Sequence, residues 1–505
     1  MHSLIACNNV CIVASVSTVA PTERVATAGQ PPSTRPIYVA GEWVQTGEPV
    51  SVTSKGAGEE LARTFHAGAE ELERATAAAV AAEKPLAALA AYERGDALRA
   101  ISAGLLERRD ELACQLAAEA GKPVKDATVE IERGALTFRL AAEEAERQYG
   151  EVVPLDLNAA SRGRIAIVRR FPIGAVAAIS PFNLPLGLAA HKVAPALAVG
   201  CPVVLKPPSS TPLTMLSVAE LVDATSLPKG SLSVLPMRRD VGERLVTDPR
   251  FKLLTFTGSP EVGWAMKERA GKKKVVLELG SNAAAIVDET ADVDWAIERC
   301  AYGAFKYAGQ LCISVQRIFV HESVWERFVG GFVARARSLR VGAPLDPATD
   351  IGPMIDSASA DRVRGWIDDA LAGGGTALLR GEGEGVFLGP TILTDVPTTA
   401  VLSCEEAFGP VAVLTRFRDL DEALDAADDS RFGLQAGIFT ENLTNAWKAF
   451  DRLHVGGVIV NDAPTYRMDN MPFGGVKDSG LGREGLRWAM EDMTEPRTLV
   501  MAGRG

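Results

Sequence analysis

The sequence of 505 residues lacks the cysteine and histidine patterns that stabilise small secreted domains or hold metals. Its seven cysteines are widely spaced, their number is odd, and none forms a CxxC pair. That pattern argues against a disulfide framework and against a zinc ribbon. The five histidines form no ligand-like cluster and give no support to a histidine-based triad. We therefore predict no metal site and expect a reducing, cytoplasmic location.

The sequence also lacks a net positive charge and long apolar runs. The formal net charge is −11, which disfavours nucleic acid and anionic membranes as partners, because both bind basic surfaces. No uninterrupted apolar run is long enough to cross a bilayer. The first twenty residues are partly apolar, but they lack a positive start and Asn8-Asn9 interrupt the run, unlike a signal peptide. We expect residues 1–35, rich in Ser, Thr, Pro and Ala, to be a disordered extension.

Short apolar runs alternate with helical patterns between Gly174 and Gly280. The expected strands are Ala175–Ile179, Val203–Leu205, Ser233–Leu235, Lys252–Phe256 and Val275–Leu279. The expected helices are Gly187–Ala198, Thr214–Ala224, Val241–Thr247 and Glu261–Ala270. Repeated βαβ units of this size predict a parallel, doubly wound sheet, which binds its ligand beyond the carboxyl ends of its strands.

The rest of the chain shows a helical stretch, a second α/β pattern and exposed strands. Ala69–Gly150 is expected to be helical, as are segments near Val293–Phe305, Glu322–Leu339 and Ala358–Ala372. Glu151–Phe171 alternates like the strands of an arm that pairs with another subunit, although a plain surface hairpin fits the same pattern. A chain of this length is expected to form two or three domains.

Three residues are candidates for catalytic roles: Cys312, Glu278 and Asn183. Cys312 lies in FKYAGQLCISVQR, just before the β-rich stretch Ile313–Val320. A nucleophilic thiol there would be partly exposed beside backbone N–H groups, and a buried structural cysteine is the alternative. Glu278 ends an apolar strand in LELGS, where burial raises the pKa of a carboxyl and suits it to general base catalysis, unless it is a structural ion-paired residue. Asn183, in the stiff loop PFNLP, can donate to an oxyanion or serve turn geometry alone.

Further polar residues and glycines follow the expected strands. Lys206 ends one strand and Ser209 lies in the turn after it, where the ribose or phosphate of a nucleotide would lie. Gly258 and Gly263 frame the strand-to-helix turn FTGSPEVG, which suits backbone approach to a pyrophosphate. The turn EEAFGP, Glu405–Pro410, places a carboxylate two residues before an aromatic ring.

Together and in this order, these segments resemble the NAD(P)-dependent aldehyde dehydrogenase superfamily from about Tyr38 to Val500. The motifs are PFNLP, KPPSSTPL, FTGSPEVG, LELGS, GQLC, EEAFGPV and PFGGVKDSGLGREG. The resemblance implies an α/β fold with a Rossmann-like parallel-sheet cofactor domain, a second α/β catalytic domain and a small β oligomerisation arm. The expected division is 36–150 and 172–281 for the cofactor domain, 282–480 for the catalytic domain, and 151–171 and 481–505 for the arm and tail.

The resemblance also implies roles for single residues. Cys312 corresponds to the catalytic thiol, Asn183 and the Cys312 backbone N–H to the oxyanion hole, and Glu278 to the base that activates water. The positions that correspond to cofactor-binding residues are Ser180, Lys206, Ser209, Gly258, Ser259, Glu406 and Phe408. The expected cofactor is NAD or NADP. Members that prefer NAD commonly carry Glu at the position of Ser209, and a serine does not repel a 2′-phosphate, so the sequence leaves the preference open.

The implied reaction is oxidation of a small aldehyde to its carboxylic acid through a thiohemiacetal and a thioester on the cysteine. Two alternatives remain: a CoA-acylating dehydrogenase, against which Glu278 argues, and a non-catalytic cofactor-binding protein. The motifs resemble the branch that acts on polar or acidic aldehydes: lactaldehyde-like, semialdehyde or phosphorylated. Arg467 and Arg133 are expected near the pocket mouth, where a guanidinium would bind the charged end of the substrate. A surface ion pair is the alternative for Arg133. A homodimer or homotetramer is expected.

Overall fold

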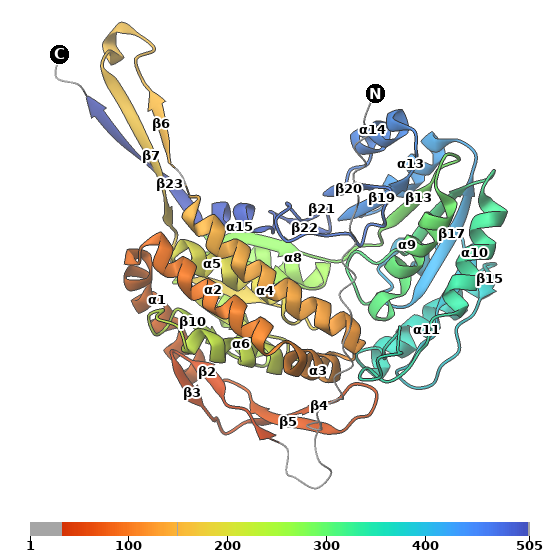
Figure 1. Ribbon diagram of the computed structural model, residues 1–505, viewed down its shortest axis with the longest axis horizontal. Helices are drawn as coiled ribbons and strands as arrows, with labels where there is room; N and C mark the ends of the chain where they lie inside the picture. The colour runs from red at the N-terminus through yellow and green to blue at the C-terminus, as the bar shows by residue number, and fades with distance from the viewer. Residues whose placement is uncertain (1–32, 149, 503–505) are drawn as a thin grey trace, which may run out of the picture.

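The structure, a computed structural model, describes residues 33–148 and 150–502 of the chain. Two open β-sheets with helices packed on them form the body, and a three-stranded arm projects from it (Figure 1). The fold is therefore α/β, as predicted. Residues 1–32 of the expected N-terminal extension lie outside the described residues. The expectation of disorder is wrong for residues 33–35, because Ser33–Thr34 form strand β1 and Arg35 makes an ion pair with Glu220 at 2.8 Å.

The first sheet has eight strands in the order β22-β12-β11-β8-β9-β10-β2-β3. Five of them are parallel: β8 (Val176–Ile179), β9 (Val203–Lys206), β10 (Leu232–Val234), β11 (Leu253–Thr257) and β12 (Lys274–Glu278). Their connecting helices are α5 (Gly187–Val199), α6 (Leu213–Asp223), α7 (Arg239–Thr247) and α8 (Pro260–Arg269). The predicted βαβ units are confirmed, with ends shifted by one or two residues. At the far edge, β2 (Ile37–Val39) and β3 (Glu42–Val44) form an antiparallel hairpin.

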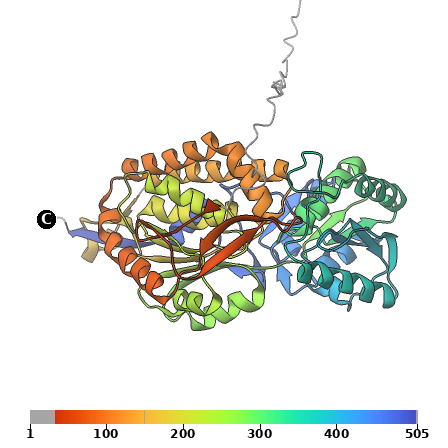
Figure 2. The ribbon, with the colours of Figure 1, turned by 90° about the horizontal axis from the view of Figure 1, so that it is seen from below.

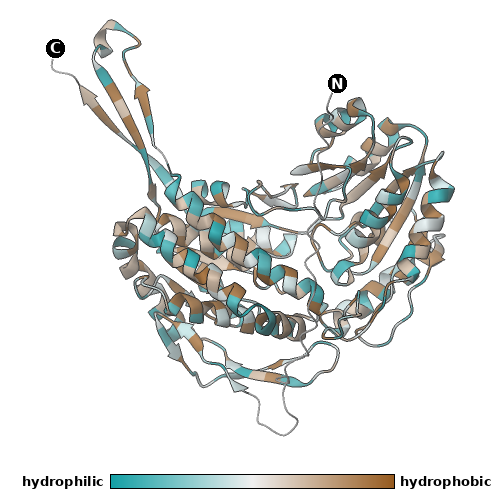
Figure 3. Cartoon of the chain, in the orientation of Figure 1, coloured by the Kyte–Doolittle hydropathy of each residue, from teal (hydrophilic) through white to brown (hydrophobic). Residues whose placement is uncertain are grey.

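Helices cover both faces of this sheet, which is why its strands are apolar throughout rather than alternating. In β8, Val176 and Ala178 join one hydrophobic core, while Ala177 and Ile179 join the core on the opposite face. The predicted helical stretch consists of α1 (Ala69–Ala88), α2 (Ala91–Glu107), α3 (Arg109–Ala120) and α4 (Val124–Glu146). Figure 2 shows the helices above and below the strands, and Figure 3 shows the polar outer faces of the helices.

The second sheet has seven strands in the order β15-β16-β17-β14-β13-β19-β20. Its strands are β13 (Ala284–Val287), β14 (Arg317–His321), β15 (Thr376–Leu379), β16 (Thr391–Thr394), β17 (Val411–Phe417), β19 (Gln435–Phe439) and β20 (Gly457–Val460). The helices are α9 (Val293–Phe305), α10 (Trp325–Arg337), α11 (Ser357–Ala372), α12 (Val401–Cys404), α13 (Leu420–Asp428) and α14 (Leu443–Arg452). The three predicted helices of this part are present. The predicted β-rich stretch is wrong at its start, because residues 313–316 form no strand: the Ser314 N–H closes a turn on the carbonyl of Leu311 at 3.0 Å, and the Val315 N–H donates to the carbonyl of Gly303 at 3.1 Å.

The projecting arm is an antiparallel sheet of β6 (Glu151–Pro154), β7 (Arg164–Pro172) and β23 (Thr494–Ala502) (Figure 1). Sequence analysis did not identify the small sheet of β1, β4 (Pro49–Thr53) and β5 (Glu60–Phe65). Among the described residues, no helix combines the length and the apolarity needed to cross a bilayer.

A glycine-rich segment near the C-terminus joins the two sheets. Strand β21 (Val476–Lys477) pairs with β18 (Phe432–Gly433), and β22 (Gly480–Leu481) pairs with β12 of the first sheet. Helix α15 (Leu486–Asp492) then packs against α4 and α5. Residues 480–492, assigned to the tail or its border by sequence, therefore contact the first sheet and its helices. The division of the chain into domains stays a prediction.

Candidate active site

The turn that carries Cys312 begins in a conformation that side chains rarely adopt. After α9, the 3₁₀ turn Lys306–Gly309 contains Tyr307 at φ +51°, Ala308 at φ +53° and Gly309 at φ +68°. A Cβ atom on Gly309 would lie 2.1 Å from the carbonyl oxygen of Gly409, so this position requires glycine. Left-handed backbone at non-glycine residues stores strain and clusters at functional sites. The turn leaves the Cys312 side chain partly exposed between the two sheets.

Asn183 and Gln310 meet directly before the cysteine. The Asn183 side-chain Nδ2 donates to the backbone carbonyl of Gln310 at 3.0 Å. The Gln310 side chain is fully buried and fixes the turn, since its Nε2 donates to the carbonyls of Tyr307 and Pro353 and its Oε1 accepts from the Ile355 N–H. The structure therefore brings the Asn183 carboxamide beside the residue that precedes Cys312.

A buried ion pair supports the loop that holds Asn183. Glu130 on α4 accepts hydrogen bonds from the backbone N–H groups of Leu186 and Gly187, at 3.0 and 3.1 Å, where α5 begins. Its other carboxylate oxygen pairs with Lys122, whose ammonium lies 4.7 Å from the centre of the Tyr307 ring. Glu130 and Lys122 thus connect the Asn183 loop to the strained turn before Cys312.

Glu278 is the last residue of β12 and is 2% exposed. Neither of its carboxylate oxygens has a hydrogen-bond partner among the described residues. Burial, followed by the negative charge of Glu484, raises the pKa of Glu278 well above its usual range. Burial and the carboxylates of Glu406 and Glu278 likewise raise the pKa of the Cys312 thiol to about 12. The Cys312 thiol is therefore protonated at neutral pH, and burial favours the protonated form of Glu278 as well.

Glu484 stays ionised beneath Glu278 because cations surround it. Lys192 donates to Glu484 Oε1 at 3.0 Å, and Arg467 Nη2 donates to Oε2 at 3.0 Å. Although burial opposes ionisation, the charges of Lys192 and Arg467 hold the pKa of Glu484 at about 2. The environment thus shifts the pKa values of two neighbouring buried carboxyls in opposite directions, up for Glu278 and down for Glu484.

The carboxyl ends of the first sheet offer a crevice for a dinucleotide. The chain runs from β8 through β9 to β10 and then returns to β11 on the other side of β8, which places a topological switch point between β8 and β11. The hydroxyls of Ser180, after β8, and Thr257, at the end of β11, are buried without partners among the described residues. Burial lowers the pKa of Lys206, whose ammonium has no acceptor in the described part of the chain.

The remaining predicted cofactor residues lie on the turns around this crevice. Ser209 is half-buried in the turn between β9 and α6, and Gly258 and Ser259 connect β11 to α8. Unsatisfied donors, a helix N-terminus and a switch point together fit a dinucleotide.

Glu406 and Phe408 lie in the loop between α12 and β17. Glu406 Oε1 accepts from the backbone N–H of Ser281 at 2.9 Å, and burial raises the pKa of Glu406 to about 8. Phe408, at φ +47°, packs edge-on against Phe182 with ring centres 5.9 Å apart. Burial and the charge of Glu406 raise the pKa of Cys312, and Phe408 contacts the residue before Asn183, so Glu406 and Phe408 lie near the predicted nucleophile.

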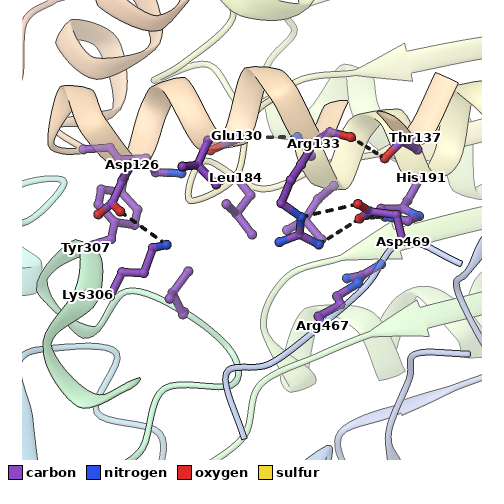
Figure 4. A pocket seen from close by; sticks show the side chains of 15 residues that line it. Asp126, Glu130, Arg133, Thr137, Leu184, His191, Lys306, Tyr307, Arg467 and Asp469 are labelled. Carbon is purple, nitrogen blue, oxygen red and sulfur yellow. Dashed lines mark hydrogen bonds and ion pairs between the residues drawn. The ribbon is translucent and has the colours of Figure 1, made fainter. Parts of the chain in front are cut away.

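Arg133 and Arg467, which are 334 positions apart (467 − 133), line the same cavity, together with Leu311 from the cysteine turn. Figure 4 shows both guanidinium groups at one end of this cavity, beside Asp469, with the Lys306–Asp126 ion pair at the other end. Arg133 does not make the helical surface pair considered above, because its Nη2 donates to Asp469 Oδ1 at 2.8 Å. Arg467 is almost buried and stacks on Phe473 at 3.9 Å from the ring centre.

A model of the aldehyde dehydrogenase family matches residues 43–499. The chain belongs to this family. The protein is thus an enzyme, an aldehyde dehydrogenase that uses NAD or NADP.

Similar proteins cover nearly the whole chain. The 3-sulfolactaldehyde dehydrogenase of Priestia aryabhattai is 43% identical over 92% of this chain and 97% of its own length. The crystal structure of aldehyde dehydrogenase 21 from Physcomitrella patens, in complex with the reaction product succinate, has a TM-score of 0.93 and 46% identity, and the match covers 94% of this chain and all of that one. The NADP complex of NADP-dependent glyceraldehyde-3-phosphate dehydrogenase from Bacillus halodurans C-125 has a TM-score of 0.90 and 37% identity, over 94% and 100%.

Sequence analysis of this aldehyde dehydrogenase missed the residues that position the site. They are Lys122, Glu130, His191, Lys192, Gln310, Asp469 and Glu484. One signal was present: His191 and Lys192 interrupt the otherwise apolar helix α5, where buried polar groups require partners. Their partners Asp469 and Glu484 lie far away along the chain and leave no local pattern.

Proposed function

We propose that this aldehyde dehydrogenase oxidises a small aldehyde that carries an anionic group at its far end. One observation carries the proposal: two guanidinium groups line one cavity beside the cysteine turn, and each has N–H groups without an acceptor among the described residues. Arg133 uses Nε and Nη2 toward Asp469, and no described residue accepts from its Nη1. Arg467 uses Nη2 toward Glu484, while its buried Nε has no partner in the described part of the chain. Free guanidinium donors are suited to a carboxylate, sulfonate or phosphate.

The charge of the cavity supports the same substrate class. Its lining contains the cations Lys122, Arg133, Lys306 and Arg467 and the carboxylates Asp126, Glu130 and Asp469. With the buried His191 neutral, the lining is cationic by one charge. An anionic substrate end would balance that charge. The 3-sulfolactaldehyde named for one relative and the succinate bound in another each carry such an end.

The chemical steps that we propose use Cys312, Asn183 and Glu278. The Cys312 thiol proton passes to solvent water as Sγ adds to the aldehyde carbon, and the Asn183 carboxamide and the Cys312 backbone N–H hold the oxyanion that forms. Lys206, Ser209 and the turn after β11 would hold NAD(P)⁺, which would supply the hydride acceptor. After oxidation the sulfur carries a thioester, and Glu278, once ionised, takes a proton from the water that hydrolyses it.

A pair of aldehydes that differ only in the anionic group tests the substrate class. Succinate semialdehyde and butanal share a four-carbon chain. The Arg467→Leu variant should lose about 10- to 100-fold more kcat/KM on succinate semialdehyde than on butanal, because it removes a charge-assisted hydrogen bond. Arg139→Leu, an exposed change on α4, is the matched control. Equal losses on both aldehydes in Arg467→Leu would give Arg467 a folding role and contradict the proposal.

We further propose that the enzyme is a homo-oligomer in which the arm of one copy covers the edge of the second sheet in another. Strand β20 is the last strand of that sheet, and Leu443, Trp447 and Phe450 on the adjacent α14 are 72%, 59% and 59% exposed. The arm presents an exposed apolar strand end, including Leu499 at 59%. Light scattering coupled to size exclusion tests this: Trp447→Glu should shift the enzyme toward smaller species, and an unchanged mass would contradict the interface.

A further inference from the structure

Asp469 is a buried carboxylate that connects two helices beside the substrate cavity. It lies in the loop between β20 and β21, and its side chain is 3% exposed. Arg133 from α4 donates to it from Nη2 at 2.8 Å and from Nε at 3.4 Å. His191 Nε2 from α5 lies 3.0 Å from Asp469 Oδ1. All three residues line the cavity with Arg467 (Figure 4).

This arrangement keeps a negative charge where an anionic substrate would be repelled. Although burial opposes ionisation, the hydrogen bond of His191 and the charge of Arg133 hold the pKa of Asp469 below its usual range. Burial and the charge of Arg467 lower the pKa of His191, so the imidazole is neutral near pH 7 and donates through Nε2. A site that needed positive charge alone would be better without Asp469.

The position of Arg133 explains why the carboxylate is there. The Arg133 side chain is 38% exposed and belongs to a helix at the cavity wall, so a free guanidinium could extend into water in many conformations. Contacts from both Nε and Nη2 to one carboxylate fix the plane of the guanidinium. The remaining Nη1 is then held at the cavity.

We propose that Asp469, itself fixed by His191, is a positioning residue that orients Arg133 toward the anionic end of the aldehyde. This inference rests on the proposed function, because it requires that Arg133 bind an anionic group. In this proposal, the affinity that the substrate gains from an oriented Arg133 exceeds the affinity that it loses through repulsion by the Asp469 carboxylate. The substrate's anionic end then meets a guanidinium whose conformational freedom is already restricted.

Replacing Asp469 by asparagine should change KM for succinate semialdehyde in opposite directions under the two possible roles of Asp469. If Asp469 acted only through its charge, Asp469→Asn would strengthen anion binding and lower KM for succinate semialdehyde. As a positioning residue, it should instead raise that KM about tenfold, with a much smaller change for butanal and in kcat. Asp110→Asn, on the exposed side of α3, is the matched control. A fall in KM, or equal losses on both aldehydes, would overturn the inference.

Two variants of His191 keep the test decisive if Asp469→Asn folds poorly, and a double-mutant cycle gives a second test if it folds. His191→Gln retains a side-chain donor toward Asp469 and should preserve most of the selectivity, whereas His191→Leu should lose it. In a double-mutant cycle, Asp469→Asn should add little to the loss already caused by Arg133→Leu, because it acts through that arginine. Additive losses, or equal behaviour of His191→Gln and His191→Leu, would overturn the inference.

The same data separate this inference from the proposed function. If Arg133→Leu and Arg467→Leu show no selective loss on succinate semialdehyde, the anionic substrate class is wrong, and the role of Asp469 falls with it. If those arginine variants lose selectivity while Asp469→Asn does not, only the positioning role is overturned.

Discussion

Replacing Glu278 by glutamine should change how the stability of this aldehyde dehydrogenase depends on pH. Glu278 is buried, its carboxylate oxygens have no partners among the described residues, and burial raises its folded-state pKa well above the ordinary value of a glutamate, which the unfolded chain retains. Between these two pKa values, the folded chain therefore holds one more proton than the unfolded chain. Its free energy of unfolding should fall by about 1.4 kcal/mol for each pH unit of increase in that window.

The glutamine variant lacks this ionisation, so its stability relative to wild type should rise with pH. Within the window, the difference between the two proteins grows by about 2.7 kcal/mol over two pH units. Urea unfolding followed by tryptophan fluorescence at pH 5.5, 6.5 and 7.5 measures it for both proteins. The pH at which the difference stops growing would report the folded-state pKa of Glu278.

A matched change at the surface separates this effect from a general response to the loss of a carboxylate. Glu107 is exposed at the end of α2, and the difference between Glu107→Gln and wild type should stay flat over the same pH range. A flat difference for Glu278→Gln as well would show that Glu278 is already ionised in the resting enzyme. That result would refute the argument that burial governs this carboxyl.

The remaining predictions concern catalysis. Cys312→Ala should lower aldehyde oxidation by at least about 10³-fold while NAD(P) still binds, as measured by fluorescence titration, and substantial turnover would contradict the assignment of the nucleophile. Glu278→Gln should give a rapid burst of reduced cofactor and then slow turnover, because the thioester forms and persists; fast steady turnover would mean that another base acts. Ser209→Glu should shift the ratio of NAD to NADP efficiency toward NAD by about tenfold or more, because the new carboxylate repels a 2′-phosphate, and an unchanged ratio would remove Ser209 from that choice. Wild-type turnover should rise with pH above neutrality, because burial raises the pKa of the Cys312 thiol to about 12 and the nucleophile must lose its proton; a pH-independent rate would contradict this.

The central strands and their crossover helices could be predicted from sequence because each carries its own pattern. A buried parallel strand is a short apolar run, and the helix after it shows its own period. Glu278 was identifiable for the same reason, since a carboxyl that ends an apolar strand is conspicuous locally. The turn after Cys312 was not, because Ile313 and Val315 resemble a strand while backbone bonds to Gly303 bend the chain.

The supporting residues of the site could not be predicted from local pattern. His191 and Asp469 are 278 positions apart, and Arg133 and Asp469 are 336 apart, so only the folded chain brings them together. The small sheet of β1, β4 and β5 was missed because its strands are short and partly polar.

The pairing of β22 with β12 gives the chain an unusual order of assembly. Leu279 donates its backbone N–H to the carbonyl of Ser479 at 2.9 Å, so the 200-position span between them (479 − 279) leaves the first sheet and returns to the same place. That span is an insertion into the first sheet, and its two ends, Leu279 and Ser479, are hydrogen-bonded to each other. During synthesis, Glu278 on β12 has no β22 partner until residues up to Gly480 have been made. Strand β22 can therefore pair with β12 only after the second sheet's residues have been synthesised.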